Sequence, residues 1–580
     1  MPLEVESGSR PGRPALLAVL TAVTLVGALA LAWRQTESRR ALGPEVRVAD
    51  TPVHIRPPRG WQVDPRDAHN FVLPVRREGW RRQQLSHERR IRITYERRES
   101  FLPVETWLEA VRGNGGGRAP AAQPARLGRF PAVETRLLVP KRLGHKRFYG
   151  EVLVRAALLP RGDVILVEYD PLVDLRPTDY AILDDVCATL RVDDPALTVS
   201  REEALARAGL AFPVAPRWTV TGPAFPEVPG VFVGGLSDGL PAWALGVFRT
   251  CRAYGRTLEA LLADFAWDRW MQPEAESDIR SQTRARGGAL AYIRQPRAVR
   301  GSDNVVAVYA VATSDSDAAL IFAYAGPDFA AAAEDAAAEL AGALEFRAHP
   351  GAFDYERAIA DGARLVARLN ERGAVPRWGR EAVEHVYDGF APGVTLLLRI
   401  QRAALGRDAE QGYRGWELLE SNRRQEQHTR WELDGRAQGY ESRTEFWRAN
   451  TRVTIEERRE GAAPRVHRST RLADARPESV TFRVGPAFVP PPAESIIEGW
   501  AARGDAPAVV VEYSSLAARG ACAVLLRALP PAEDRPRVLI QFDYRPFGIL
   551  VTFDDATGEP ASIDWGAALL RRVPSSPPHR

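Results

Sequence analysis

The stretch PPRGWQV, Pro57 to Val63, has a partial copy, VAPRWTV, at Val214 to Val220. In both stretches a proline and an arginine lead to a tryptophan, which is followed by a polar residue and a valine. A turn residue before alternating polar and apolar positions is typical of the start of a β-strand. We therefore expect the chain to begin one module twice, with Trp61 and Trp218 as core anchors.

Matching segments follow each tryptophan in the same order. After Trp61 come NFVLP and RRIRITYE, and after Trp218 come GVFVG and WALGVFRT, all of which are strand-like. Each copy then continues with a threonine-capped helix start, another strand and a long hairpin. Each closes with a helix near a proline, Pro177 or Pro327, which suits a first helical turn.

This order predicts two antiparallel-sheet-plus-helix modules of the α+β class, at residues 51–195 and 211–347. Ser200 and Glu203 have capping-box spacing, and Gly209 follows at a helix end. We therefore expect a helical linker at residues 196–210.

The element order resembles the PsbP-like α+β fold, in which helices cover an antiparallel sheet. The residues behind this resemblance are Pro58-Arg59-Gly60-Trp61, the strand at Gly128 and the closing hairpin and helix. The resemblance covers residues 50–346. Relatives in that fold are mostly small accessory or envelope proteins without catalytic residues, so it implies no site residue in this chain.

The last third of the sequence has a different pattern. Residues 348–392 hold a linker and an amphipathic helix, and residues 393–570 hold about ten strand-like segments with short connections. They predict a large antiparallel meander, flat or curled into a half-barrel, whose concave side the helix AESIIEGWAA could plug. Residues 571–580 are expected to be a disordered tail.

This layout resembles the LolA-type family of envelope carriers, whose half-barrel shelters acyl chains. The resemblance is one of architecture alone. It implies an apolar concave face and an apolar or lipid ligand. Alternating Val, Leu and Phe residues equally make an ordinary core, so both interpretations stay open.

Residues 15–33, ALLAVLTAVTLVGALALAW, form an uncharged apolar run about as long as a helix that crosses a bilayer. We predict a transmembrane helix there, after an N-terminal tail (1–14) and before a juxtamembrane linker (34–50). A cleaved signal peptide is the alternative, because Ala30-Leu31-Ala32 resembles a cleavage site.

The orientation of such an anchor is open. More arginines follow the run than precede it, which favours a cytoplasmic body, whereas a short N-terminal tail before a first apolar segment is typical of export. We expect a single-pass membrane protein with an extracytoplasmic body.

Composition excludes several kinds of site. A net charge of +4 over 580 residues does not indicate a nucleic-acid partner. The three cysteines, Cys187, Cys251 and Cys522, are far apart, which indicates neither a disulfide framework nor a zinc site. The nine histidines are scattered without metal-binding spacing. We therefore expect no metal and no cofactor.

One stretch of the sequence matches a catalytic motif. GLSDG, Gly235 to Gly239, satisfies G-x-S-x-G, in which Ser237 would be the nucleophile on a turn between a strand and a helix. The next segment, WALGVFRT, is strand-like, so a hairpin loop explains the glycines better.

The sequence thus predicts a membrane-anchored, non-catalytic envelope protein that binds a protein partner or an apolar ligand. A serine hydrolase that uses Ser237 is one alternative, and a purely structural envelope scaffold is the other.

Overall fold

The computed structural model forms two compact units, which we describe separately. The first comprises residues 1–94, 115–157 and 165–193, and the second comprises residues 95–114, 158–164 and 194–580. The structure describes residues 41–573 except 50, 66, 74–88, 97–122, 144–145, 160–162, 172–174, 194–199, 216–217, 224–226, 238–239, 264–279, 284–291, 299–304, 313–316, 326–328, 348–353, 373–382, 392–393, 407–412, 422–425, 435–437, 449–450, 474, 505–506, 516–519, 555–557 and 565–568.

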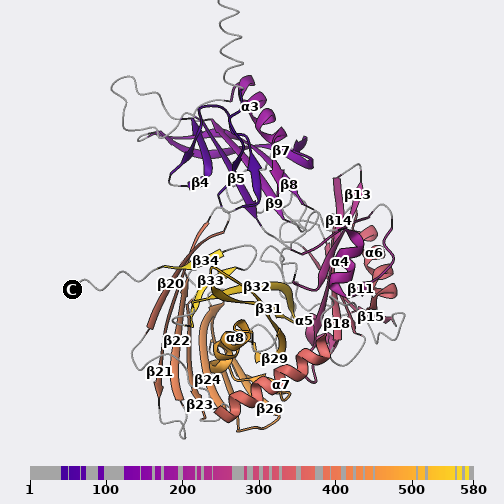
Figure 1. Ribbon diagram of the computed structural model, residues 1–580, viewed down its shortest axis with the longest axis vertical. Coiled ribbons are helices and arrows are strands. Elements are labelled where there is room, and N and C mark those ends of the chain that lie inside the picture. Colours follow the sequence, from indigo (N-terminus) through magenta and orange to yellow (C-terminus); the bar gives the residue numbers. More distant parts are fainter. Residues whose placement is uncertain are drawn as a thin grey trace, which may run out of the picture. The chain divides into compact units, whose positions relative to one another are not determined.

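The N-terminal part of the chain builds a seven-stranded antiparallel sheet with the strand order β3-β4-β5-β9-β8-β7-β6 (Figure 1). A smaller sheet, β1-β2-β10, joins the start of this module to its end. The elements are β1 (Val46–Arg47), β2 (Val53–Ile55), β3 (Gln62–Asp64), β4 (Asp67–Leu73), β5 (Arg89–Glu96), β6 (Gln123–Leu127), β7 (Phe130–Leu143), β8 (Lys146–Leu158), β9 (Val164–Pro171), α3 (Pro177–Ala188) and β10 (Arg191–Val192).

A second sheet follows with the order β12-β13-β14-β18-β17-β16-β15, and β11 pairs with β19 beside it. Strand for strand this is the order of the first sheet, and the strand pair β11 and β19 again joins the start of a module to its end. The elements are α4 (Arg201–Ala208), β11 (Leu210–Ala211), β12 (Trp218–Thr221), β13 (Gly230–Ser237), β14 (Leu240–Cys251), α5 (Leu258–Ala263), β15 (Arg280–Thr283), β16 (Tyr292–Ala298), β17 (Val305–Ala312), β18 (Asp317–Ala325), α6 (Ala330–Ala343) and β19 (Glu345–Phe346).

The two tryptophans differ in burial. Trp218 is buried at the start of β12 and makes an edge-to-face contact with Trp243, with ring centroids 5.4 Å apart. Trp61 is half-buried just before β3, 6.3 Å from the ring of Tyr169. Only the second tryptophan is therefore a fully buried core residue.

The predicted α+β class is wrong, because strands dominate the described residues and the helices are few and short. One physical reason is that the structure forms two paired strands where the sequence predicts a single strand. The segment ARLGRFPAVETRLLV folds back on itself at Gly128, whose φ of 56° lies in the left-handed region, and forms β6 and β7. In the second module the equivalent segment begins at the end of β15 and continues into β16, while α5 has only 6 residues.

The prediction of a single-pass membrane protein is also corrected. Among the described residues no helix has the length and apolar character needed to cross a bilayer. The predicted span, residues 15–33, lies outside the described residues, as do residues 1–14 and most of the predicted linker at 34–50.

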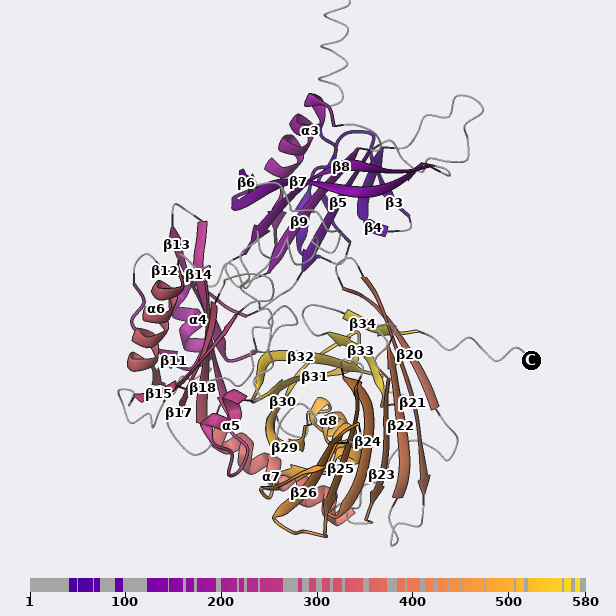
Figure 2. The ribbon, with the colours of Figure 1, turned by 180° about the vertical axis from the view of Figure 1, so that it is seen from behind.

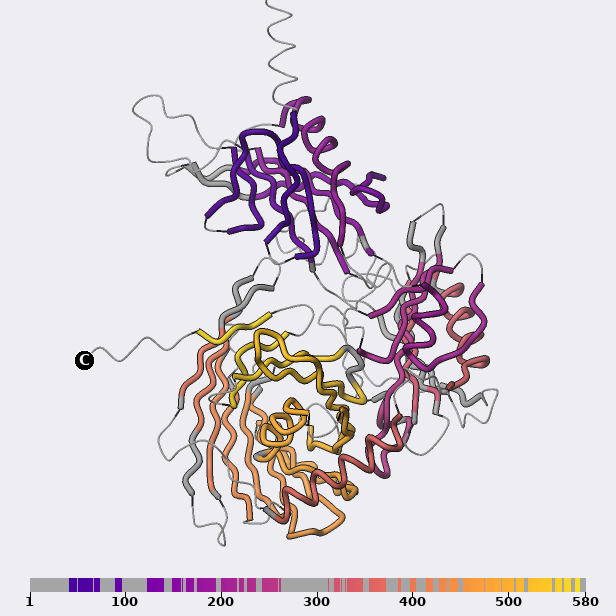
Figure 3. The backbone as a smooth tube through the Cα atoms, viewed as in Figure 1, coloured from indigo at the N-terminus to yellow at the C-terminus, as the bar shows by residue number. Residues whose placement is uncertain are grey.

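The C-terminal part forms one sheet of fifteen strands in the order β27-β26-β25-β24-β23-β22-β21-β20-β34-β33-β32-β31-β30-β29-β28. All neighbours are antiparallel except β28 and β29. The chain runs outward from β20 to β27, and its last strand then returns to pair with β20 (Figure 3).

The elements of this part are α7 (Tyr355–Arg372), β20 (Val383–Ala391), β21 (Val394–Gly406), β22 (Tyr413–Ser421), β23 (Glu426–Leu433), β24 (Tyr440–Arg448), β25 (Thr451–Arg459), β26 (Arg465–Leu472), β27 (Glu478–Arg483), β28 (Phe488–Val489), η5 (Pro491–Ala493), α8 (Glu494–Ala502), β29 (Ala508–Ser514), β30 (Ala521–Ala532), β31 (Arg535–Phe542), β32 (Arg545–Phe553), β33 (Pro560–Asp564) and β34 (Leu569–Arg572).

This sheet curls around α8 (Figure 2). The helix packs its buried residues Ile497 and Ala501 toward β30 and β31. Its Glu494 and Glu498 interact with charged groups on β21, β22 and β25, in the other half of the sheet. Because α8 has neighbours in both halves, it lies on the concave side.

Within the second unit, the second seven-stranded sheet is joined to the C-terminal sheet by buried polar contacts. Arg256 donates two hydrogen bonds from Nη1 to the carboxylate of Asp543, at 2.8 and 3.0 Å, and both side chains are buried. The Glu512 carboxylate accepts 2.7 Å hydrogen bonds from the backbone N–H groups of Tyr254 and Gly485. These contacts hold the loop after β14 against the C-terminal sheet.

Candidate functional site

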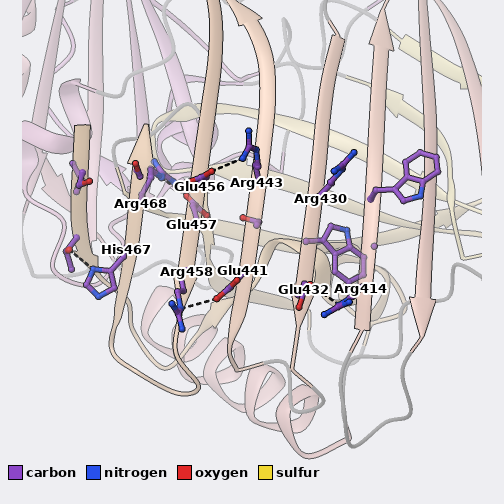
Figure 4. Close-up of a pocket in the computed structure, with 18 residues that line it drawn as sticks. Arg414, Arg430, Glu432, Glu441, Arg443, Glu456, Glu457, Arg458, His467 and Arg468 are labelled. Carbon is purple, nitrogen blue, oxygen red and sulfur yellow. Dashed lines mark hydrogen bonds and ion pairs between the residues drawn. The ribbon is translucent and has the colours of Figure 1, made fainter. Parts of the chain in front are cut away.

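A groove of about 740 Å³ crosses the six strands β22 to β27 (Figure 4). That volume lies within the range of about 300–1,000 Å³ that is usual for ligand sites. Three residues from each strand line it, and the strand register aligns them in three rows. The first row comprises Trp416, Arg430, Arg443, Glu456, Ser469 and Ser479. The second row comprises Arg414, Glu432, Glu441, Arg458, His467 and Thr481. The middle row, which lies between these two, comprises Gly415, Trp431, Ser442, Glu457, Arg468 and Val480.

The first and second rows form the walls of the groove. Side chains alternate between the faces of a strand, so these two rows share one face and the middle row belongs to the other. The pattern of burial agrees, because Arg430 and Glu432 are exposed whereas Trp431 between them is buried. With usual strand spacings the walls are roughly 6.7 Å apart and about 24 Å long.

The centre of each wall carries one sign of charge. Arg430 lies directly opposite Arg443 in the first row, and Glu432 lies directly opposite Glu441 in the second. Like charges in directly opposed positions destabilise a sheet. The first row thus has a basic stretch at its centre, which faces an acidic stretch at the centre of the second row. We call the first row the basic wall and the second row the acidic wall.

Ion pairs with residues of the neighbouring strands, and with Glu445 of the same strand β24, compensate most of these charges. Arg443 donates to Glu456 at 3.1 Å and to Glu445 at 2.7 Å. Arg414 and Glu432 approach to 2.8 Å, and Arg458 and Glu441 to 3.0 Å (Figure 4). Among the described residues Arg430 forms no ion pair, so it is the uncompensated cation of the basic wall.

The ion pairs in the groove are solvated and therefore weak. Most of the side chains concerned are about half exposed, and exposed pairs contribute about 0–1 kcal/mol each. Glu445 is held more firmly, since hydrogen bonds from Arg452 and Arg443 lower its pKa below the usual range. A ligand that offered equivalent charges could replace the weak pairs at little cost.

The floor of the groove is fixed from beneath by a buried polar cluster. Glu457 on β25 is 5% exposed and accepts from Arg468 and Tyr440. The Ser514 hydroxyl, on β29, lies 2.7 Å from both oxygens of Glu457, and Arg468 donates to Ser514 Oγ at 2.8 Å and to the Ser515 carbonyl at 2.9 Å. The cluster thus connects β25 and β26, near one end of the sheet, to β29, near the other.

Ser237, the candidate nucleophile, lies far along the chain from this groove. It ends β13 and pairs with Leu240, the first residue of β14. A strand therefore follows the serine within a hairpin, whereas a nucleophile elbow needs a helix at that position. Its side chain lies outside what the structure describes.

No metal or cofactor site was expected, and the described residues contain no group of three His, Cys, Asp or Glu side chains that could hold a metal ion. Cys187, Cys251 and Cys522 are buried, free thiols. Burial raises the pKa of the Cys187 thiol to about 12, which does not favour the reactive thiolate.

Sequence reasoning identified the strands of the groove except β26, and it missed the walls. The signal was present as charges two residues apart in successive strands, in RWE, ESR and EER at residues 430–432, 441–443 and 456–458. Only the register between strands shows that equal charges fall opposite each other.

Comparison with known proteins adds little to this geometry. No protein-family model matches the chain, and no curated protein matches it. It is similar to a solved structure described as a beta-barrel-like protein of a domain of unknown function, DUF1849, from Brucella abortus, with 12% sequence identity and a TM-score of 0.23. The alignment covers 33% of this chain and 95% of that one.

Proposed function

We propose that the protein is a non-catalytic binding protein, whose groove across β22 to β27 takes an extended segment of a protein partner. The observation that carries this proposal is the pair of oppositely charged stretches at the centres of the two walls, Arg430 with Arg443 and Glu432 with Glu441.

The partner segment is expected to alternate acidic and basic residues. Successive side chains of an extended chain point to opposite sides. A strand laid along the groove would therefore direct its acidic side chains to the basic wall and its basic side chains to the acidic wall. About eight residues in this conformation span roughly 26 Å, close to the length of the groove.

An acyl-chain ligand on the concave side has less support. The LolA-type resemblance implies an apolar concave face, whereas α8 and the strands around it carry Glu494, Glu498, Arg402 and Glu417 there. Burying charged groups beside a hydrocarbon chain is costly unless they are paired.

Two labelled peptides of equal composition test the proposal. We expect (Glu-Lys)4 to bind the full-length protein at least about tenfold more tightly than Glu4Lys4, because only alternation matches both walls at once. Binding should weaken as salt rises from 50 to 300 mM, since exposed charges are screened. Fluorescence anisotropy measures both effects.

Arg430→Glu supplies the site-specific variant. It reverses the uncompensated cation of the basic wall, so the affinity for (Glu-Lys)4 should fall at least about tenfold. Arg535→Glu is the matched control, because it makes the same charge change at an exposed residue of β31 outside the groove. Equal binding of the two peptides, or equal loss in both variants, would contradict the proposal.

A further inference from the structure

The two modules differ in their smaller sheets. In the first module this sheet has three strands, and β2 lies between β1 and β10. In the second module the equivalent sheet has two strands, β11 and β19, and no strand of the described residues takes the place of β1. A position that a strand fills in one module is therefore open in the other.

Matching hydrogen bonds show which residues of the two small sheets correspond. The Asp193 N–H donates to the Pro52 carbonyl at 2.8 Å, and the Arg347 N–H donates to the Gly209 carbonyl at 2.9 Å. Both acceptors lie nine residues before the tryptophan of their module. The register between β2 and β10 is thus repeated between β11 and β19, so β11 is the counterpart of β2.

In the first module the edge of β2 that faces away from β10 is occupied. Val46 on β1 pairs with Ile55 on β2. The Val48 N–H, just after β1, donates to the Val53 carbonyl at 2.9 Å. The backbone of β2 is therefore bonded on both sides.

The same edge of β11 has no strand beside it among the described residues. Successive residues of an antiparallel strand direct their backbone groups to alternate sides. Since Gly209 bonds toward β19, Leu210 and Phe212 direct their backbone groups away from β19. Phe212 corresponds to Ile55, and among the described residues its backbone N–H and C=O have no hydrogen-bond partner. The edge thus offers a donor and an acceptor to an added strand.

A cavity of about 520 Å³ lies at this edge. Every residue from 209 to 213 lines it, together with Leu205 and Ala206 of α4. The helix packs beside β11 and buries Ala204 and Ala208 in the core of the module (Figures 1 and 2). The open strand position is therefore bordered by α4 and not filled by it, and its volume is within the range usual for binding sites.

The charges beside the two edges are reversed. In the first module Glu45, the residue before β1, pairs with Arg191 on β10 at 2.8 Å. Glu345 on β19 holds the position of Arg191, because each lies two residues before the matching N–H donor of its module. Its pair with Arg347, at 3.2 Å, is exposed and therefore weak. Glu202 also lines the cavity and forms no ion pair among the described residues.

We propose that the open edge of β11 binds an extended segment of a protein partner, which adds a third strand and alternates apolar and basic residues. The backbone of Phe212 bonds to the added strand, and its side chains give specificity, as in other strand additions. Its apolar residues take the places that Val46 and Val48 hold in the first module. A basic residue at the position of Glu45 meets Glu345. This site is independent of the groove across β22 to β27.

Two labelled peptides that copy β1 test this edge on the full-length protein. The first, ALGPEVRVA, is the sequence of residues 41–49, and the second is the same peptide with Glu45→Lys. We expect the lysine peptide to bind at least about tenfold more tightly, because lysine is opposite in charge to Glu345 whereas glutamate is not. Fluorescence anisotropy measures both affinities.

Reversing the charge on the protein should reverse the preference. Glu345→Arg should bind ALGPEVRVA more tightly than the lysine peptide, since it restores the pairing of Glu45 with Arg191 that the first module contains. Glu339→Arg is the matched control, because it makes the same charge change at an exposed residue of α6 outside the cavity. This variant should keep the preference of the wild type.

Cross-linking locates the bound peptide. A photoreactive diazirine at the position of Val46 in the lysine peptide should attach to residues 202–213, as peptide mapping by mass spectrometry would show. No binding of either peptide, equal affinities, an unchanged preference in Glu345→Arg or attachment elsewhere would overturn the proposal. A concentration-dependent dimer that the peptide dissociates would do so too, because the edge would then belong to a second copy of this chain.

Discussion

Replacing Glu457 by glutamine should lower the free energy of unfolding by about 3 kcal/mol or more, because it leaves Arg468 buried beside a neutral group. Glu457 and Arg468 are 5% and 6% exposed, and the carboxylate also accepts from Tyr440 and Ser514. Since this cluster connects β25 and β26 to β29, its loss should open the sheet between its two ends. Urea unfolding monitored by tryptophan fluorescence measures the change.

The neighbouring residue provides the matched control. Glu456 is exposed on the opposite face of the same strand and pairs with Arg443 at 3.1 Å. Glu456→Gln should change stability by no more than about 0.5 kcal/mol, as exposed pairs usually do. The double replacement Glu457→Leu with Arg468→Met should recover much of the loss, because no unpaired charge stays buried. Equal effects at positions 456 and 457 would refute the role of the cluster.

Gly362→Ala should be about as damaging, at roughly 3 kcal/mol, because α7 lies directly on β29 at this glycine. A Cβ there would lie 1.9 Å from the carbonyl oxygen of Val510 and 2.7 Å from its carbonyl carbon. The obstacle is backbone and cannot rotate away, so α7 must shift and lose packing along its length. The Tm of the full-length protein measures the effect.

Gly342→Ala is the control for helix propensity. Gly342 lies in α6, and a Cβ there would meet nothing within 4 Å. Alanine should therefore stabilise the protein slightly, by about 0.5–1 kcal/mol or less near a helix end. A gain in stability at Gly362 as well would mean that the close approach of α7 to β29 does not occur.

Local patterns in the sequence were sufficient for much of the strand content. The expectation of a chain rich in β-sheet is confirmed, since runs such as AVVVEYS and RVLIQFDY become β29 and β31. The helix after Ser200 is α4, whose Glu203 N–H donates to the Ser200 hydroxyl and which ends at the left-handed Gly209. Such features depend on neighbours a few residues away, which a single sequence displays.

Features that depend on contacts between residues far apart in the chain could not be predicted from the sequence. The turn at Gly128 makes two strands, β6 and β7, of one expected strand, and strands dominate the modules that were expected to be α+β. In AESIIEGWAA, Glu494 and Glu498 have the spacing of an ordinary solvent face. Only the curl of the sheet, which depends on β34 returning to β20, places them on its inner side.

The position of α7 bears on where the C-terminal part can be cut from the chain. Residues 508–511 of β29 pair with β30 on one side, while β28 reaches only residues 512 and 513 on the other. The helix packs along β29, and its Gly362 lies against the backbone of Val510. Helices that cover a strand edge prevent it from recruiting strands of other molecules. A fragment that began after Arg372 would carry a bare edge prone to aggregation, so α7 belongs to the sheet and is not a linker before it.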